Sequence, residues 1–316
     1  MPAGRGRKPW AAHKFVVAVT AAGAVSASSA RAGAWCRTTT CDPTSEKQQC
    51  MLEPGTGCMI TGMPLYWRGR CISFGVDHRG SPKRGIDHET ARTVIWSAYR
   101  SWLDTDCAGQ PPSLELSDSP APIRCDHQEY NQDDGNANAW IFLDDAWPYE
   151  GRGHQLALTT LTFNVDNGEI FDVDVEINSF QFTITVGDDA VQADLQSVAT
   201  HEAGHFFGLS HSNVQGATMR PQYSEGDSSL RSLEADDVEG ICALYPADRE
   251  VAACQSTSVP RHGFSADCGA PPEEDSGCRT TRPGGPSPGA PHALGMLVFG
   301  ALLFRARRAF STRPRS

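Results

Sequence analysis

The residues best suited to chemistry in this sequence are three histidines and a glutamate within one short stretch. His201, Glu202, His205, Gly208 and His211 follow the spacing H-E-x-x-H-x-x-G-x-x-H. Imidazole nitrogens are common zinc ligands, and a neighbouring carboxylate can act as a general base. A chance match at all five positions has a probability on the order of 1 in 10,000, so unrelated surface or core histidines are the weaker interpretation.

The surrounding sequence favours a helix that ends just after the second histidine. Residues 191–207 contain no proline, and their apolar residues recur at helical spacing: Val191, Leu195, Val198 and Phe206. Residues four apart share a helix face, so His201 and His205 can hold one ion. Gly208 tolerates the left-handed backbone that ends a helix, and the turn there can bring His211 round as a third ligand. The fourth tetrahedral position is left for water, as in a catalytic zinc site.

The segments that follow resemble one branch of the zinc proteases. Residues 217–223, ATMRPQY, are similar to the Met-turn of the metzincins, in which a methionine, here Met219, packs beneath the metal. Ser212 after the third histidine, the Met-x-Pro-x-Tyr turn and the stretch 233–245 resemble the matrixins, the matrix-metalloprotease branch. Astacin-like and serralysin-like enzymes carry a tyrosine ligand two residues after the methionine, where this chain has Pro221. A three-histidine site is therefore expected.

This resemblance covers residues 65–246 and implies a fold and a mechanism. The implied fold is α+β: a twisted mixed five-stranded sheet with three helices and a zinc cleft between upper and lower subdomains. One catalytic zinc on the three histidines would activate water, and Glu202 would take the water proton and pass it to the leaving amine. Substrate would lie along Leu156 and Ala157, on an edge strand spanning 156–160, and against a pocket wall containing Pro221 and Tyr223. An interior strand is the alternative for 156–160.

The pattern of residues supports an α+β domain independently of the resemblance. We expect strands at 65–76, 113–116, 139–143, 157–165 and 169–177, a helix capped by Asp87, and a last helix over 230–244. Trp96 and Trp102 are interpreted as core residues of the first helix. In the last helix, the resemblance suggests that Asp236 or Asp237 supports the Met-turn, while a favourable interaction with the helix dipole is the alternative.

Three acidic residues that alternate along one predicted strand could form a calcium site. Asp172, Asp174 and Glu176 project to one side of a strand, where oxygen ligands suit a structural Ca²⁺; solvated carboxylates are the alternative.

A net charge of -11 argues against a nucleic-acid partner. We expect a monomer that acts on protein or peptide substrates.

Eleven cysteines and the two ends of the chain indicate export. Residues 1–34 combine basic residues, an apolar run and a small-residue cleavage site, as a secretory signal peptide does. We expect structural disulfides in the Cys-rich segment 35–64, and zinc-directed latency from one of its cysteines is the weaker option. Residues 247–291 are predicted to be a Pro/Gly-rich linker with one disulfide. Residues 292–316, an apolar run followed by arginines, are similar to C-terminal sorting tags (MYXO-CTERM type), which predicts attachment to the cell surface or outer membrane.

The function that follows is a secreted or surface-attached zinc endopeptidase. Two alternatives remain at this point. One is a secreted binding or adhesion module that keeps the fold without turnover, and the other is a zinc amidase acting on cell-wall peptides.

Overall fold

The computed structural model describes residues 35–43, 48–254 and 260–269, together with the backbone of three short strands, β1 (Lys14–Val17), β12 (Met296–Gly300) and β13 (Leu303–Arg305). Most of the predicted signal peptide, much of the predicted linker and most of the predicted sorting tail therefore lie outside the described residues. Within the described part of the chain, no helix is both long and apolar enough to cross a membrane.

The core of the molecule is a mixed sheet. Five adjacent strands run in the order β6 (Ala157–Phe163), β7 (Ile170–Ile177), β5 (Ala139–Phe142), β3 (Cys71–Val76) and β4 (Glu115–Asp118), with β4 at one edge of the sheet. The last four are mutually parallel, and β6 alone runs antiparallel to its neighbour β7. On its other edge, β6 pairs with β12, and β12 pairs with β1. The predicted five-stranded mixed sheet is confirmed.

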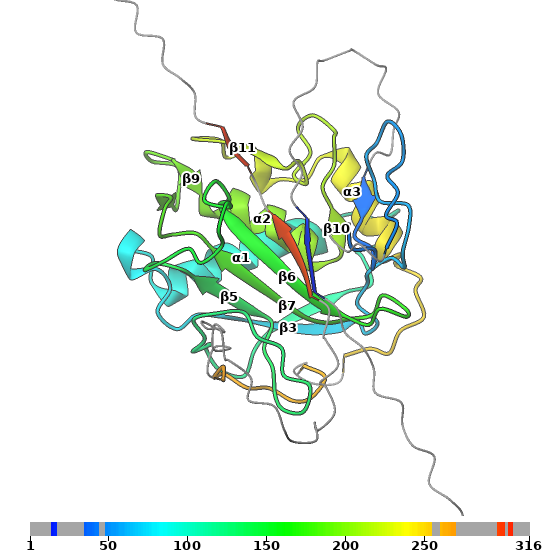
Figure 1. Cartoon of the computed structure of the whole chain (residues 1–316), viewed down its shortest axis with the longest axis horizontal. Coiled ribbons are helices and arrows are strands. Elements are labelled where there is room, and N and C mark those ends of the chain that lie inside the picture. The colour runs from blue at the N-terminus through cyan, green and yellow to red at the C-terminus, as the bar shows by residue number, and fades with distance from the viewer. Residues whose placement is uncertain are drawn as a thin grey trace, which may run out of the picture.

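Two helices pack against this sheet and position the metal stretch (Figure 1). Helix α1 (His88–Leu103) begins at Asp87, whose side chain accepts a hydrogen bond from the Thr90 amide, as the sequence predicted. Helix α2 (Leu195–Phe206) begins at Asp194, which caps it in the same way through the Ser197 amide. Trp102 of α1 donates its indole N–H to the Thr200 carbonyl over 2.8 Å, so the two helices are fixed to each other next to the metal stretch.

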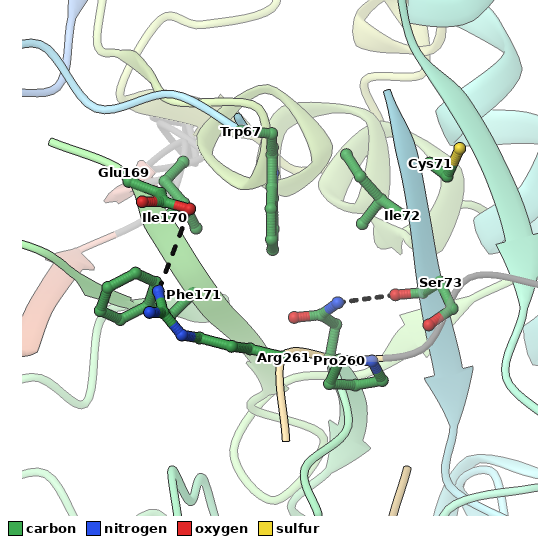
Figure 2. Close-up of a pocket in the computed structure, with 10 residues that line it drawn as sticks. Trp67, Cys71, Ile72, Ser73, Glu169, Ile170, Phe171, Pro260 and Arg261 are labelled. Atoms are coloured by element: carbon green, nitrogen blue, oxygen red, sulfur yellow. Dashed lines mark hydrogen bonds and ion pairs between the residues drawn. The ribbon is translucent and has the colours of Figure 1, made fainter. Parts of the chain in front are cut away.

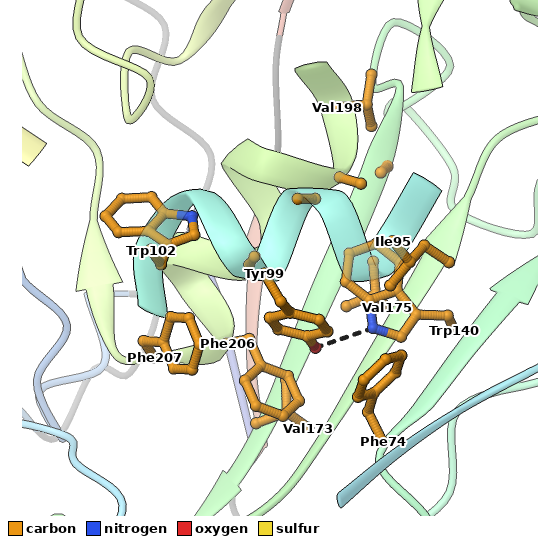
Figure 3. Packing of buried hydrophobic residues seen from close by; sticks show 14 of the residues in the cluster. Phe74, Ile95, Tyr99, Trp102, Trp140, Val173, Val175, Val198, Phe206 and Phe207 are labelled. Atoms are coloured by element: carbon orange, nitrogen blue, oxygen red, sulfur yellow. Dashed lines mark hydrogen bonds between the residues drawn. The ribbon is translucent and has the colours of Figure 1, made fainter. Parts of the chain in front are cut away.

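Aromatic side chains fill the space between the helices and the sheet (Figure 3). Tyr99 lies at the centre, with its ring 5.1 Å from Phe206 and 4.7 Å from Phe74, and its hydroxyl bonded to the Trp140 indole. Edge-to-face aromatic contacts of this kind restrict side-chain orientation as well as burying area. Trp102 is fully buried, as predicted, whereas Trp96 is half-buried and donates to Asp118. The core therefore holds the end of α2 in a single position.

Several predicted boundaries were wrong by a few residues. The metal helix begins at Leu195 instead of Val191, because residues 193–194 form strand β9 (Ala193–Asp194), paired with β8 (Ile184–Thr185). Residues 65–70 are not a strand. The last helix is divided into a short 3-10 turn, η2 (Ser229–Arg231), and α3 (Ala235–Leu244), which Glu234 and Asp237 cap reciprocally. A further 3-10 turn, η1 (Pro82–Arg84), precedes α1.

Five disulfides lie within the described residues. Cys36–Cys58 and Cys41–Cys50 staple the N-terminal segment, which confirms structural pairing of these four cysteines. Cys107–Cys242 joins the loop after α1 to α3. Cys71–Cys254 and Cys125–Cys268 tie residues 247–269 back to the domain, so the prediction of a linker with one internal disulfide was wrong for this part. The pairings close loops of 183 and 143 residues, which no local pattern reveals.

Candidate metal centre and active site

Helix α2 and the turn after it bring the three predicted histidines together. Their ring centroids lie 4.8 to 5.3 Å apart, and one potential ligand atom from each lies within 4.8 Å of the others. Among the described residues, these are the only three or more His, Cys, Asp or Glu side chains clustered closely enough to hold a metal ion. Gly208 adopts a φ of +93°, in the left-handed region, and begins the turn that carries His211 back toward the helix.

Backbone carbonyls orient the first two rings. His201 Nδ1 lies 2.6 Å from the Thr218 carbonyl oxygen, and His205 Nδ1 lies 2.9 Å from that of Leu209. A carbonyl can only accept, so each Nδ1 carries the proton and each Nε2 keeps its lone pair. His201 Nε2 is buried without a hydrogen-bond partner, and His205 Nε2 lies 3.2 Å from His211 Nε2. This donor set fits a zinc ion.

Burial keeps the three imidazoles neutral. It lowers the pKa of His201 to about 4 and also lowers the pKa of His205 and His211, with the neighbouring rings adding to the effect. Because only a neutral imidazole can bind a metal, the site is prepared for one at neutral pH.

Glu202 follows His201 on α2, and its carboxylate is fully buried. Thr159 on β6 donates its hydroxyl to Glu202 Oε2 over 2.5 Å, whereas Oε1 has no hydrogen-bond partner. Burial raises the pKa of Glu202 to about 8, and the bond from Thr159 opposes that rise. A divalent cation at the histidines would lower it further by Coulomb attraction. One oxygen is thus anchored and the other can accept a proton.

Met219 lies directly beneath the metal-binding part of α2. A Cβ built on Gly204, between the two helical histidines, would lie 2.2 Å from Met219 Sδ and 2.8 Å from Trp102. Asp237 accepts from the amides of Thr218 and Met219 over 2.7 and 3.0 Å, so the prediction that an aspartate of the last helix supports the Met-turn is confirmed.

The neighbouring aspartate has a different partner. Asp236 accepts from the Ser212 hydroxyl over 2.6 Å, directly after the third histidine. The two acids together hold both loops that complete the metal site.

The predicted substrate-binding residues lie on two separate elements, and most of them are buried. Leu156 and Ala157 are fully buried, at the start of the strand that pairs with β7 on one edge and β12 on the other. Tyr223, on β11 (Gln222–Ser224), is also fully buried, and its hydroxyl binds the Asp194 amide and the Asp227 carbonyl. Tyr223 therefore fixes the pocket segment to the start of α2, while Pro221 is only half-buried.

The three predicted calcium ligands are buried, and two of them accept hydrogen bonds from other residues of the chain. Asp174 accepts from the Glu129 and Ala139 amides at 2.9 Å each, and Glu176 accepts from the Tyr149 hydroxyl. Asp172 Oδ1 has no hydrogen-bond partner. Burial raises the pKa of all three carboxyls. Their ligand atoms do not converge as the histidines do, so calcium at this strand stays a prediction.

A separate hollow lies between the sheet and the C-terminal segment (Figure 2). Its lining residues include Trp67, Ser73 and Phe171, and Arg261 closes it by stacking 4.4 Å over the Phe171 ring, with its guanidinium 4.0 Å from Glu169. None of the metal-site residues lines it. It is the seam along which residues 260–269 pack, held by the Cys125–Cys268 bond.

Comparison with known proteins decides the family. The family model of the matrixins (Peptidase_M10) matches residues 67–246. The chain belongs to the matrixin family. The matched residues thus form a domain of the zinc metalloendopeptidase type, and the histidine cluster, which could hold the zinc that matrixins use, lies within them.

Several curated proteins are similar to this matrixin. The metalloendoproteinase 2-MMP of Arabidopsis thaliana is 30% identical over 219 residues, which cover 66% of this chain and 51% of the relative. Matrix metalloproteinase-C of Caenorhabditis elegans is 26% identical (60% of this chain, 32% of the relative), and human matrix metalloproteinase-17 is 28% identical (62% and 30%). The chain thus spans from half to less than a third of the length of these relatives.

Sequence reasoning missed Thr159 as a residue of this site. No local signal marks it, because it lies 43 residues before Glu202 and reaches the carboxylate only through the packing of β6 on α2. The period of two along the strand does place residues 157, 159 and 161 on one face, which could have identified Thr159 as the polar member of an otherwise apolar face.

Proposed function

We propose that this matrixin is a secreted or surface-attached zinc endopeptidase in which Glu202 acts as the general base. The observation that supports this most strongly is the convergence of three neutral imidazoles, those of His201 and His205 buried and that of His211 half-buried, with a buried carboxylate that has one unpartnered oxygen. A metal site that served structure alone would have no use for such a carboxylate.

Different residues of the site bind the metal, transfer the proton and position the side chains. Zinc, when bound by His201, His205 and His211, supplies a Lewis acid that lowers the pKa of a water and polarises a carbonyl oxygen. Glu202 Oε1 takes the proton of the attacking water and gives it to the amine that leaves, while Thr159 holds Oε2 in place. Met219 and the Thr218 carbonyl keep the histidine rings in position.

The substrate would bind as an extended strand along β6. The pairing of β12 with β6 over Leu158–Thr162 supports this proposal, because the backbone groups of β6 are in position to bond an antiparallel strand, and a peptide would take the place of β12. A peptide bound there would gain main-chain hydrogen bonds that do not depend on its sequence, and pockets near Pro221 would supply selectivity. This arrangement suits proteins or peptides as substrates.

The disulfides support a location outside the cytosol. Five disulfides persist only in an oxidising compartment, which agrees with the signal peptide predicted at residues 1–34. Surface attachment through residues 292–316 stays a prediction.

Cleavage of denatured protein by the purified enzyme, with and without a chelator, tests this function. We expect cleavage that is lost on chelation and restored by zinc. Zinc-bound protein without cleavage would favour the binding or adhesion module. Cleavage confined to purified cell-wall peptides would favour the amidase.

A further inference from the structure

Two short strands near the C-terminus pair with two different elements of the domain. β12 pairs antiparallel with β6 over Leu158–Thr162. β13 pairs parallel with β11, with Leu303 opposite Gln222. Figure 1 shows both strands in red tones, one beside β6 and the other beside β11. We call residues 296–305, which contain these two strands, the tail segment.

Both partners of the tail segment belong to the candidate active site. Thr159 of β6 donates its hydroxyl to Glu202, and Phe299 of β12 is the residue opposite Thr159 in the register. Opposite residues of an antiparallel pair have Cα atoms about 4.5–5.5 Å apart. β11 begins three residues after Met219, which lies beneath the metal-binding part of α2. The tail segment therefore runs beside the strand that anchors the base and beside the continuation of the Met-turn.

The connection between the two strands is short. Only Ala301 and Leu302 separate them in the sequence, so the Cα atoms of Gly300 and Leu303 are at most about 11 Å apart. β1, on the other edge of β12, lies in the predicted signal peptide, so the pairings with β6 and β11 are those that a mature chain would keep. The tail segment thus takes the place along β6 that a peptide substrate would need.

The sequence of the tail suits this position. Leu297, Val298 and Phe299 are apolar, and the valine and the phenylalanine favour an extended strand. Residues 292–316 contain five arginines and no acidic residue, whereas the whole chain has a net charge of -11. These opposite charges favour association of the tail with the rest of its own chain.

We propose that the tail segment occupies the substrate position of its own chain and keeps the enzyme latent until it is displaced or removed. The tail competes with substrate because one edge of β6 can pair with only one strand at a time. Tethering also gives the tail an effective concentration on the order of millimolar, far above that of most substrates. This inference rests on the proposed peptidase function and names the regulation of its active site.

The first test detects the bound tail without using activity. All proteins lack the signal peptide and carry Glu202→Ala, which prevents cleavage of the tail, and Cys278→Ser, which removes the cysteine outside the five described disulfides. Thr160→Cys/Val298→Cys places two cysteines opposite each other. The control, Thr160→Cys/Leu297→Cys, shifts the second cysteine by one residue to the other face.

We expect a disulfide within one chain in the first pair, detected by mass spectrometry after proteolysis, and none in the control. Opposite Cα atoms lie within the range of about 4.4–6.8 Å that a disulfide spans, whereas side chains on opposite faces point apart.

The second test measures latency in the active enzyme. Leu297→Pro/Val298→Pro removes the amide donors of two adjacent residues, one of which must point toward β6. If the site is open about a tenth of the time, this variant should lower the KM of a short peptide about 10-fold. kcat should not change, because saturating substrate displaces the tail. Ser311→Pro/Thr312→Pro, beyond β13, is the control and should match the wild type.

Three results would overturn the inference. They are equal crosslinking of the two cysteine pairs, a KM that the proline pair in β12 leaves unchanged although the wild-type tail is intact by mass, and a KM difference that disappears on dilution, which would show binding between chains. A wild type that cuts itself within residues 300–303, at a rate independent of enzyme concentration, would support the inference. If no protein cleaves any peptide, the proposed peptidase is refuted, and the crosslink still tests the tail.

Discussion

Thr159 on β6 donates its hydroxyl to the carboxylate of Glu202 on α2, over 2.5 Å and with both side chains fully buried. This bond connects the strand that is proposed to hold the substrate with the residue that is proposed to move the proton. The substrate backbone and the base are thereby set in one geometry. Small displacements at such a contact are costly for catalysis.

Replacing Thr159 by valine keeps its shape and removes the donor. We expect kcat to fall by about 10- to 100-fold with little change in KM or zinc content, because a buried carboxylate oxygen loses a hydrogen bond worth about 1.5–3 kcal/mol. Thr159→Ser should recover most of the activity. Steady-state kinetics on the two variants check this, and equal losses in both would show that the methyl group matters and the hydroxyl does not.

Gly204→Ala should damage the site although alanine favours a helix. The new Cβ would meet Met219 Sδ at 2.2 Å and Trp102 at 2.8 Å, so the Met-turn or α2 must move. We expect turnover and zinc retention to fall together, despite a gain of up to about 1 kcal/mol in helix propensity. Gly69→Ala is the control, since its nearest neighbour would be 4.0 Å away. Unchanged zinc retention in Gly204→Ala would show that Met219 does not support the metal.

Asp237→Asn should loosen the Met-turn more than Asp236→Asn does. Asp237 accepts three backbone amides, from Thr218, Met219 and Glu234, and an asparagine NH₂ would face some of these donors. We expect a loss of about 1–3 kcal/mol in the free energy of unfolding. The Ser212 hydroxyl that donates to Asp236 can rotate to suit an amide, so that variant should lose less. Thermal unfolding of both proteins measures the difference, and an equal loss would contradict it.

Glu176 should make stability depend on pH. Burial raises its pKa from 4.5 to about 7, so the folded state binds the proton more tightly than the unfolded state does. Stability is then lost as pH rises from about 4.5 to 7, by an amount on the order of 3 kcal/mol. In chelator, Glu176→Gln should reduce this slope, the remainder coming from other buried carboxyls with a raised pKa such as Asp172 and Asp174, and the exposed-residue control Glu225→Gln should leave the slope unchanged.

The same experiment addresses calcium. If Ca²⁺ binds at Glu176, adding it at pH 8 should raise the melting temperature of the wild type and leave Glu176→Gln unchanged. A slope that is as steep in Glu176→Gln as in the wild type would show that other groups cause the pH dependence.

Much of the fold and the metal set could be predicted because their signals are local. The spacing of His201, His205 and His211, the cap at Asp87 and the left-handed Gly208 each depend on a few neighbouring residues. Tertiary contacts account for what was missed. The bond from Thr159 to Glu202 and the disulfide from Cys71 to Cys254 join residues 43 and 183 positions apart.

The first residue of α2 could not be predicted from the local sequence pattern, because helical periodicity and the capping residue point to different positions. Val191 fits the helical periodicity, but Asp194 caps the helix three residues later and is held there by Arg231 over 2.7 Å and by the Tyr223 hydroxyl. The exposure of Met51, Leu52, Ile60 and Met63 was likewise not predictable, because periodicity does not reveal which apolar residues a disulfide-bonded segment leaves exposed.

The most direct test of the whole account measures zinc content and peptide turnover on the same preparations of Glu202→Ala and His205→Ala. Glu202→Ala should keep the zinc of the wild type and lose about 100- to 10,000-fold in turnover, because it removes the base without removing a ligand. His205→Ala should lose both, since two imidazoles hold zinc far less tightly than three. Near-normal turnover by zinc-loaded Glu202→Ala would contradict the assignment of Glu202 as the base.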